Sequence, residues 1–426
     1  MHDMTNGTLP YAINDADNHF TEPPDLYVRY IDPRHRALAI RTVTDDDGNV
    51  AQLYAGQPSK FSEAQITYSA AELERMLGTS AAGEETIPGT LLNRLNPFRG
   101  LSDAERSRLL DQFRSQAEAY GDRELRLALM DAQGIDKALM FPNRAHDLEF
   151  QFENNVDAIY ANARAFNRWI HEEVGFCHAG RMYLPPYLSL ADVDLAVAEV
   201  DRLIAQGAPV VQLRAGHAHG GRSNTTGGRS LADPLFDPVW ARVDEAGVRV
   251  AFHLGATSYQ RYGADWSEDP EVTFGDFDAF QWVCYWGDRP AMETVAGLIL
   301  HGFFQRFPRI RVVLSEQGTV WVPYVVRKMD HAFLMGRRAK WATLDRRPSQ
   351  VFRERFLVAP YPEENVAPVI AAVGVEPLVF GSDFPHGEGL AYPGQYAAAQ
   401  LGQLTDEQVR LIMRDNLEDF LVPSVT

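Results

Sequence analysis

From about residue 134 onward, short apolar segments alternate with amphipathic helical patterns. A strand buried on both faces is expected to be a short apolar run, whereas a helix repeats its apolar residues at spacings of three and four. By these criteria the predicted strands cover residues 137–141, 181–184, 210–214, 248–253, 310–316, 356–358 and 378–380. An earlier segment, residues 12–19, completes a set of eight.

Eight repeated strand–helix units favour a (β/α)8 barrel over an open doubly wound sheet. The segment after the first strand has no glycine fingerprint for phosphates, which argues against dinucleotide binding. We therefore predict an α/β fold, a TIM-type barrel that forms a single domain over residues 1–426.

Two stretches interrupt the alternation and are predicted to be insertions. Residues 45–125, after strand one, are rich in polar residues, and Ser102 with Glu105 predicts a capping box that opens a helix. Residues 255–290, after strand five, are rich in Tyr, Trp and Phe. Long loops in compact domains are usually lids or partner surfaces. The aromatic residues fit packing against the barrel or a second subunit, and they equally fit the wall of a substrate pocket.

Composition limits the partners and the compartment. The formal net charge of -18 argues against nucleic acid and against an anionic membrane surface as partners. No apolar run is long enough to cross a bilayer, and the first residues do not resemble a secretory signal. The two cysteines, Cys177 and Cys284, do not amount to a disulfide framework. We therefore expect a cytoplasmic protein that acts on a small molecule.

Side chains of the metal-ligand type lie at the predicted carboxyl ends of several strands. Asp17 and His19 alternate at the end of strand one and therefore point to the same side. His253 ends strand five, Glu316 ends strand six and Asp383 follows strand eight. In a parallel barrel these ends meet at one face, where such enzymes carry their chemistry. One such residue alone occurs by chance, but together they predict a site for a divalent cation.

Three segments carry a resemblance to a known family: Asp-Ala-Asp-Asn-His at 15–19, Gly-Phe-Phe-Gln-Arg-Phe-Pro-Arg-Ile-Arg-Val-Val-Leu at 302–314, and Phe-Gly-Ser-Asp-Phe-Pro-His at 380–386. Through them the chain resembles the amidohydrolase superfamily, in the branch of the aminocarboxymuconate semialdehyde and γ-resorcylate decarboxylases. The resemblance covers nearly the whole chain apart from the two insertions. It implies a homodimer or higher homo-oligomer, and a barrel with one divalent metal ion (Zn, Mn or Mg). The implied ligands are Asp17, His19, His253 and Asp383.

Two positions depart from the commonest pattern of that family. Many members have His-x-His on strand one, whereas this chain has Asp17 in the first place, as γ-resorcylate-type members have an acid there. Glu316 stands where the family has a strand-six histidine. A ligand set richer in oxygen shifts the preference toward Mn or Mg without excluding Zn. We assign catalytic roles to Asp383, Glu316 and His253, and leave open whether Glu316 is also a ligand.

Three further polar residues are candidates for substrate binding. Arg214, at the end of strand four, suits a forked contact with a carboxylate, although a structural ion pair fits it equally. His146 follows strand two and either reaches the mouth of the barrel or caps the next segment. His386 lies close to Asp383 and also suits a role in orienting a ligand or a loop.

The residues and the resemblance together favour a metal-dependent decarboxylase of a small cyclic or aromatic carboxylic acid. Asp383 would deliver a proton to the carbon that loses carbon dioxide. The same residues suit a hydrolase of an amide, lactone or ester, in which Asp383 takes a proton from a metal-activated water. A third hypothesis is a non-catalytic barrel subunit whose metal site is degenerate. The partner expected in the first two cases is a small carboxylated substrate.

Overall fold

The structure is a computed structural model that describes residues 9–44, 50–60, 87–218, 228–256, 279–280, 283, 287–339 and 344–422. The predicted aromatic-rich insertion at 255–290 lies mostly outside the described residues, and so do parts of the predicted insertion at 45–125. Strands and helices alternate along the described chain, which confirms a mixed α/β fold.

Seven of the predicted strand positions, together with one further strand, form two four-stranded sheets. In the first sheet β1 (Ile13–His19) pairs in parallel with β5 (Ile135–Phe141), followed by β7 (Met182–Tyr183) and an antiparallel β6 (Cys177–His178). The second sheet is wholly parallel, in the order β11-β10-β9-β8. Its strands are β8 (Val210–Arg214), β9 (Arg249–His253), β10 (Val312–Ser315) and β11 (Phe356–Val358).

Isolated parallel bridges connect these two sheets. Tyr187, just after β7, bridges to Gln212 of β8. At the other edge, Val358 of β11 bridges to Leu378, within the predicted eighth strand. That segment reaches β1, because the Ala16 N–H donates to the Phe380 carbonyl at 2.8 Å. The eighth segment therefore lies between β11 and β1, although single bridges hold it there rather than a continuous ladder.

An apolar cluster lies inward of these strands and supports the site from below. It takes one or two side chains from each strand position, because parallel strands alternate their side chains between the two faces. Its members are Ala16, Leu139, Phe141, Tyr183, Val210, Ala251, Val313, Leu357, Ala359, Val379, Leu417, Phe420 and Leu421. A much larger apolar cluster packs the outer faces of the strands against the helices.

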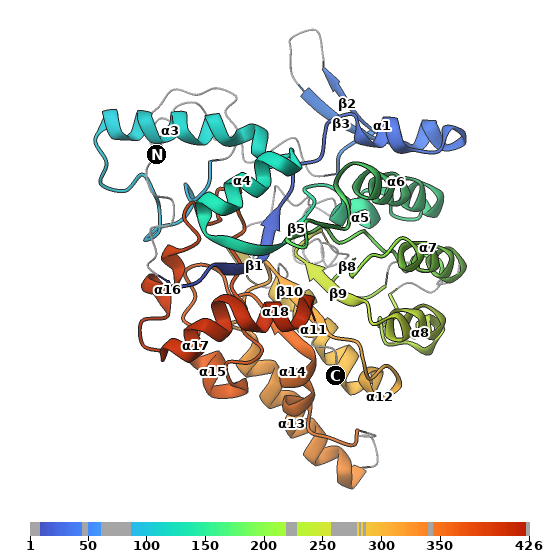
Figure 1. The fold of residues 1–426 in the computed structure, drawn as a ribbon. Helices are drawn as coiled ribbons and strands as arrows, with labels where there is room; N and C mark the ends of the chain where they lie inside the picture. The colour runs from blue at the N-terminus through green and yellow to red at the C-terminus, as the bar shows by residue number, and fades with distance from the viewer. Residues whose placement is uncertain are drawn as a thin grey trace.

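Helices surround the strands (Figure 1). Along one side lie α6 (Val156–Trp169), α7 (Val193–Ala205) and α8 (Asp237–Ala246). The remaining helices that follow strands are α4 (Arg123–Gln133), α5 (Leu148–Phe152), α11 (Asp288–Leu300), α12 (Phe303–Arg306), α13 (Val322–Ala339), α14 (Pro348–Arg355), α15 (Ala367–Val373), α16 (Gln395–Gln400), α17 (Asp406–Arg410) and α18 (Asn416–Leu421). In the part of the chain described, none of the helices combines the length and apolarity needed to span a bilayer.

Two helices, rather than one continuous helix, lie between β9 and β10 in the described chain. The first, α11, ends at Leu300, and Gly302 then adopts a left-handed conformation with φ of 67°. A left-handed residue cannot continue a right-handed helix, and glycine takes this conformation at little cost. The short α12 then begins in a new direction at Phe303.

The polar stretch after strand one contains elements of both kinds. A small antiparallel sheet, β2 (Ile40–Thr44), β3 (Val50–Tyr54) and β4 (Gln57–Pro58), projects from the body (Figure 1). The sequence did not predict this sheet. The predicted capping box is confirmed, because the Ser102 N–H donates to Glu105 Oε2 at 2.9 Å at the start of α3 (Asp103–Gln116).

Candidate metal centre

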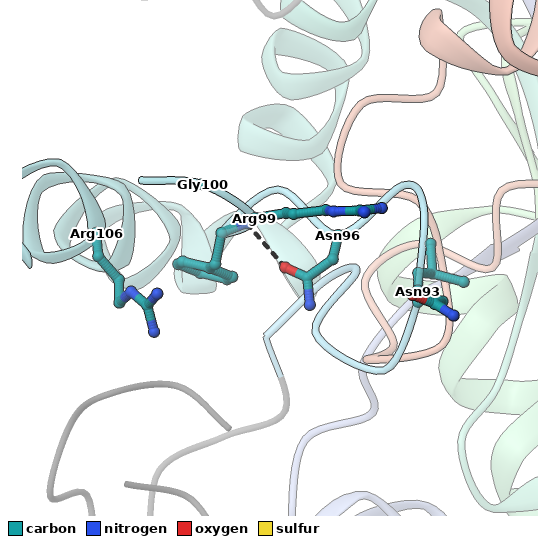
Figure 2. Close-up of a pocket in the computed structure, with 7 residues that line it drawn as sticks. Asn93, Asn96, Arg99, Gly100 and Arg106 are labelled. Atoms are coloured by element: carbon teal, nitrogen blue, oxygen red, sulfur yellow. Dashed lines mark hydrogen bonds between the residues drawn. The ribbon is translucent and has the colours of Figure 1, made fainter. Parts of the chain in front are cut away.

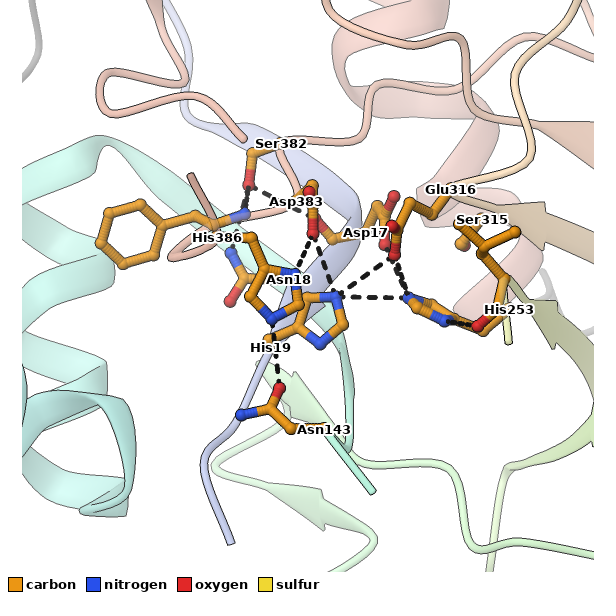
Figure 3. A network of polar contacts seen from close by, with 12 residues as sticks. Asp17, Asn18, His19, Asn143, His253, Ser315, Glu316, Ser382, Asp383 and His386 are labelled. Carbon is orange, nitrogen blue, oxygen red and sulfur yellow. Dashed lines mark hydrogen bonds and ion pairs between the residues drawn. The ribbon is translucent and has the colours of Figure 1, made fainter. Parts of the chain in front are cut away.

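The carboxyl end of β1 delivers an acid and a histidine to one point. Asp17 and His19 are both buried, and their alternation places them on the same face of the strand. Asp17 Oδ1 lies 3.4 Å from His253 Nε2, and His19 Nε2 lies 3.1 Å from Asp383 Oδ1. Figure 3 shows these side chains converging from different strands, as the sequence predicts.

His253 presents one ring nitrogen to the cluster. Its Nδ1 lies 2.7 Å from the Leu254 carbonyl, so a proton on Nδ1 donates to that oxygen and Nε2 faces inward. The two inward nitrogens, His253 Nε2 and His19 Nε2, lie 3.2 Å apart. If both imidazoles were neutral and both Nε2 lone pairs pointed into this contact, the two nitrogens would repel each other. The arrangement requires a cation or a proton between them.

The electrostatics of the cluster point the same way. Burial lowers the pKa of His19 well below its usual value, so this ring is a neutral donor. Burial alone would also lower the pKa of His253, but hydrogen bonds to Asp17 and Glu316 raise it well above its usual value. Burial raises the pKa of Asp17, and it raises that of Asp383 to about 7. Burial therefore penalises the ionised form of both carboxyl groups.

Unsatisfied atoms show that the residues fit a metal ion. Asp17 Oδ1 and both carboxyl oxygens of Asp383 are buried and lack a well-aligned hydrogen bond, although His253 and His386 lie within ion-pair distance of them. Buried polar atoms are normally hydrogen-bonded, so unpartnered oxygens at one point suit direct coordination. The possible ligand atoms form two groups, and within each group all atoms lie within 4.8 Å of one another. The first is Asp17, His19, His253 and Glu316, and the second is His19, Glu316, Asp383 and His386.

Two glycines allow close packing at the last segment, Gly381 against β1 and Gly389 against Asp383 of the segment itself. A Cβ on Gly381 would lie 2.7 Å from the Asp17 Cβ, and a Cβ on Gly389 would lie 2.2 Å from the Asp383 carbonyl oxygen. Both distances are shorter than real Cβ contacts, so larger residues would displace the backbone beside Asp17 and Asp383. The glycine before Ser382 is therefore a steric requirement of the site.

A hydrogen-bonded layer behind the cluster fixes these backbones. Ser382 donates to Asp15 through its N–H, at 2.9 Å, and its hydroxyl, at 2.5 Å. The Arg126 guanidinium donates to the carbonyl of His19 at 2.8 Å and to Asn18 Oδ1. Sequence reasoning assigned no role to Asp15, although it continues the alternating face of Asp17. Arg126 left no sequence signal, because it lies on a separate helix.

His386 joins the cluster from the outer side. Its Nδ1 lies 2.8 Å from Asp383 Oδ1, and its ring centroid lies 3.9 Å from that of His19. Its Nε2 lies 3.2 Å from the amide oxygen of Asn143, a residue that sequence reasoning missed although it closely follows β5. Burial alone would lower the pKa of His386, but the Asp383 charge raises it to about 9.

The other two substrate-binding candidates lie near strand ends. His146 packs beside His253 with ring centroids 5.4 Å apart, and its Nε2 lies 3.1 Å from Asp147 Oδ2. Arg214 is buried, and its Nε donates to Glu149 Oε2 at 3.0 Å. Its Nη2 donates to the His217 carbonyl. These contacts favour the structural ion pair for Arg214, and its role toward a substrate stays a prediction.

Two cavities in the described part of the structure lie at other residues. The first cavity has a volume of about 340 Å³ and lies between α3 and the segment before it (Figure 2). Its lining residues are Leu92, Asn93, Asn96, Phe98, Arg99, Gly100 and Arg106. A second, of about 400 Å³, is lined by Leu9, Pro10, Tyr11, Ala12, Ile13, Gln133, Gly134 and Gly394. Neither is lined by the clustered acids and histidines. The polar cluster itself therefore marks the candidate site.

Comparisons with known proteins identify the family of the chain. A family model described as amidohydrolase matches residues 15–421. An amidohydrolase structure from Mycobacterium avium subsp. paratuberculosis K-10 is 31% identical, with a TM-score of 0.79 over 98% of this chain and 100% of that one. The decarboxylase orsB of Emericella nidulans is 24% identical over 244 residues, 55% of this chain and 68% of that protein.

A more distant structure shares the fold. It is a 5-carboxyvanillate decarboxylase from Novosphingobium aromaticivorans, complexed with manganese and 4-hydroxy-3-methoxy-5-nitrobenzoic acid. It is 16% identical, with a TM-score of 0.58 over 97% of this chain and 96% of that one.

Proposed function

The chain belongs to the amidohydrolase family, and from this premise we propose that it is a metal-dependent decarboxylase of a small aromatic carboxylic acid. The observation that carries the proposal is the buried cluster of acids and histidines at the strand ends, with its unpartnered oxygens. The names of two relatives, a decarboxylase and a manganese-bound 5-carboxyvanillate decarboxylase, support the type of reaction and the class of substrate.

The proposal includes closure of the strands into a (β/α)8 barrel. The bridges at both edges of the two sheets support closure, as does the apolar cluster that draws on every strand position. In such a barrel the carboxyl ends of β1, β9, β10 and the eighth segment all open at one face. The ligands then share that face with a substrate.

Asp17, His19, His253 and Asp383 would hold one divalent ion. When bound, the ion supplies positive charge that anchors a substrate carboxylate and stabilises the electron-rich state left when the carbon–carbon bond breaks. The chain's own contribution is the rigid geometry of these four residues. Neutral imidazole at His19 and the carboxylates of Asp17 and Asp383 match the donors that Mn and Zn accept.

Asp383 is the proton donor in this proposal. Decarboxylation leaves an electron pair on the ring carbon, which must receive a proton as carbon dioxide departs. Burial raises the pKa of Asp383 to about 7, so a fraction of its carboxyl groups carries a proton near neutrality. His386 contacts the same carboxyl at 2.8 Å and holds it in place. His146 and Arg214 remain proposed contacts for the substrate.

The direct test is carbon dioxide release by the protein loaded with Mn²⁺. A panel of hydroxybenzoates and lactones is offered, and carbon dioxide and ring-opened acids are measured in parallel. We expect carbon dioxide from at least one hydroxybenzoate, and we expect Asp383→Asn to slow it by about 100-fold or more. Asp111→Asn, the same change at an exposed position on α3, is the matched control.

Two results would overturn the proposal. Hydrolysis of a lactone without any decarboxylation would assign the site to a hydrolase, in which Asp383 takes a proton from water. Full activity of Asp383→Asn would remove that residue from the reaction. Metal content of both variants is measured alongside, so that loss of the ion is separated from loss of the proton donor.

A further inference from the structure

We infer that Glu316 is a direct ligand of the divalent ion, so that this chain holds its metal with a third carboxylate from β10. The inference rests on the proposed function and concerns the same site. It goes beyond the four-residue set of Asp17, His19, His253 and Asp383, because it assigns an extra donor whose chemistry changes the choice of metal.

The position of the Glu316 carboxylate is the first argument. Its Oε2 lies 3.1 Å from His253 Nε2 and 3.8 Å from His19 Nε2. Ligands around one ion at about 2.1 Å are separated by roughly 3 to 4 Å, and both distances fall in that range. Glu316 and His19 are moreover the two residues that belong to both groups of ligand atoms.

The backbone of Glu316 is built to aim this side chain. Glu316 has φ of 53°, a left-handed conformation that costs a residue with a side chain about 1 kcal/mol or more. Asp383 has the same φ of 53° just after the eighth segment. Such conformations persist where the surroundings impose them, and they gather at ligand sites. Glu316 and Asp383 both have this conformation beside one cluster, which indicates that both side chains serve the same site.

Neighbouring groups hold the Glu316 peptide in that conformation. Tyr361 donates its hydroxyl to the Glu316 carbonyl at 3.0 Å. The preceding residue, Ser315, donates its hydroxyl to the Ala16 carbonyl at 2.6 Å, which ties β10 to β1. On the other side, Gly318 lies so close to Tyr361 that a Cβ there would be 2.7 Å from its ring. The packing therefore fixes the Glu316 backbone, from which the side chain reaches His253 and His19.

Charge is the last argument. In the described part of the chain, the ion-pair partners of Glu316 are His19 and His253, with no Lys or Arg among them. The three clustered carboxylates, Asp17, Glu316 and Asp383, likewise form their ion pairs in the described chain with histidines alone. A divalent ion within bonding distance would supply positive charge to all three carboxylates at once.

Direct ligation by Glu316 would change which metal ion the site prefers. A glutamate in place of a histidine replaces a nitrogen donor with a harder oxygen donor. Oxygen donors favour Mn²⁺ and Mg²⁺, whereas imidazole suits Zn²⁺ better. The natural chain is therefore expected to retain Mn²⁺ in competition with Zn²⁺ more effectively than a variant that carries histidine at this position.

The test measures metal binding rather than turnover. Dissociation constants for Mn²⁺ and Zn²⁺ are determined by calorimetric titration for the natural chain, Glu316→Gln, Glu316→His and a charge control. The control is Glu388→Gln, since Glu388 belongs to neither ligand group and yet experiences the charges of Glu316 and Asp17. Circular dichroism of the metal-free proteins checks that each variant is folded.

We expect Glu316→Gln to weaken Mn²⁺ binding by about 100-fold or more and Glu388→Gln by a few-fold at most. Glu316→His is expected to shift the ratio of the two affinities toward Zn²⁺ by about tenfold. Equal weakening by the two Gln variants, or an unchanged ratio in Glu316→His, would overturn direct ligation. Neither result would touch the proposed function, which depends on carbon dioxide release by the natural chain.

A crystal structure of the Mn²⁺-loaded protein gives an independent answer. Anomalous scattering locates the ion, and direct ligation requires a Glu316 oxygen at about 2.2 Å from it. An oxygen beyond about 3 Å, with a water between, would instead make Glu316 a partner of that water.

Discussion

Glu199 is the described acid whose surroundings most clearly stabilise its ionised form. It lies on α7 with 1% of its surface exposed. Asn167 of α6 donates to its Oε1 at 2.8 Å, and Arg164 of the same helix donates to its Oε2 at 3.1 Å. Arg202 pairs with it one turn further along α7. Burial alone would raise its pKa, but the hydrogen bond and charge of Arg202 lower the pKa below its usual value.

The Glu199→Gln variant should therefore be less stable in a pH-dependent way. A folded-state pKa below the unfolded value gives stability that is present above about pH 4.5 and is lost as the pH falls through the folded value. We expect the free energy of unfolding to drop by about 2 kcal/mol at pH 7, because the variant loses the hydrogen bonds to the charged carboxylate. The loss is no larger, because the partly exposed arginines keep contact with water. Urea midpoints at pH 7 and near pH 3 measure the difference, which should shrink at the lower pH.

The matched control is Glu407→Gln, an exposed position on α17. It should change the urea midpoint little at either pH. A loss in Glu199→Gln that stays constant with pH would show that packing, rather than the charge of Glu199, carries the effect.

The residues of the candidate site were predictable to the extent that they follow strand ends. Asp17, His19, His253 and Asp383 each end or follow an apolar strand. The structure places the first three in one group of ligand atoms and Asp383 in a second group, which shares His19 and Glu316 with the first. The direction of Glu316 was not predictable, because a left-handed glutamate leaves no mark in the sequence. The partner of Arg214 was not predictable either, because its ion pair depends on Glu149 from α5, which belongs to a different strand–helix unit.

At the scale of elements, α4 connects the predicted insertion to the site. Asp122 caps this helix, because its Oδ1 accepts the N–H groups of Glu124 and Leu125, both at 2.9 Å. One turn later Arg126 reaches the carbonyl of His19. The cap is thus one turn away from the residue that supports the end of β1.

Removing this cap should destabilise the helix that carries Arg126. We expect Asp122→Ala to lower the free energy of unfolding by about 1 kcal/mol, because two N–H groups lose their acceptor. Asp122→Asn keeps a capping oxygen and should lose much less. Denaturant unfolding of both variants gives the comparison, and equal losses in Ala and Asn would contradict a capping role.

The elements themselves were predicted unevenly, for physical reasons. Strand 210–214 coincides with β8, because a short apolar run between turn residues fits only a buried strand. The sheet of β2, β3 and β4 was missed, because its partly exposed strands are polar and lack a continuous apolar run. The eighth segment was predicted as a strand, and it occupies a strand position with few ladder bonds. One reason is that its Phe380 N–H donates to the Ile412 carbonyl, outside the sheets, at 3.0 Å.

At the scale of the whole molecule, the candidate ligands come from both sheets. Asp17 and His19 belong to the sheet of β1, whereas His253 ends β9 in the other sheet. Glu316 follows β10, and Asp383 comes from the segment between the sheets. A bound ion would therefore join segments that are hundreds of residues apart in sequence.

Metal removal should consequently lower the stability of the whole chain. A ligand that binds only the folded state stabilises it by about 2.7 kcal/mol at a hundred times its dissociation constant. For a chain of 426 residues this corresponds to a rise in Tm of about 3 °C. Calorimetry of the protein treated with chelator, and again after addition of Mn²⁺, measures the shift.

The His253→Ala variant should show almost no Mn²⁺-dependent rise, whereas His331→Ala, an exposed change on α13, should respond as the natural chain does. An equal rise in His253→Ala would place the stabilising ion elsewhere, because that variant lacks the donor that ties β9 to β1.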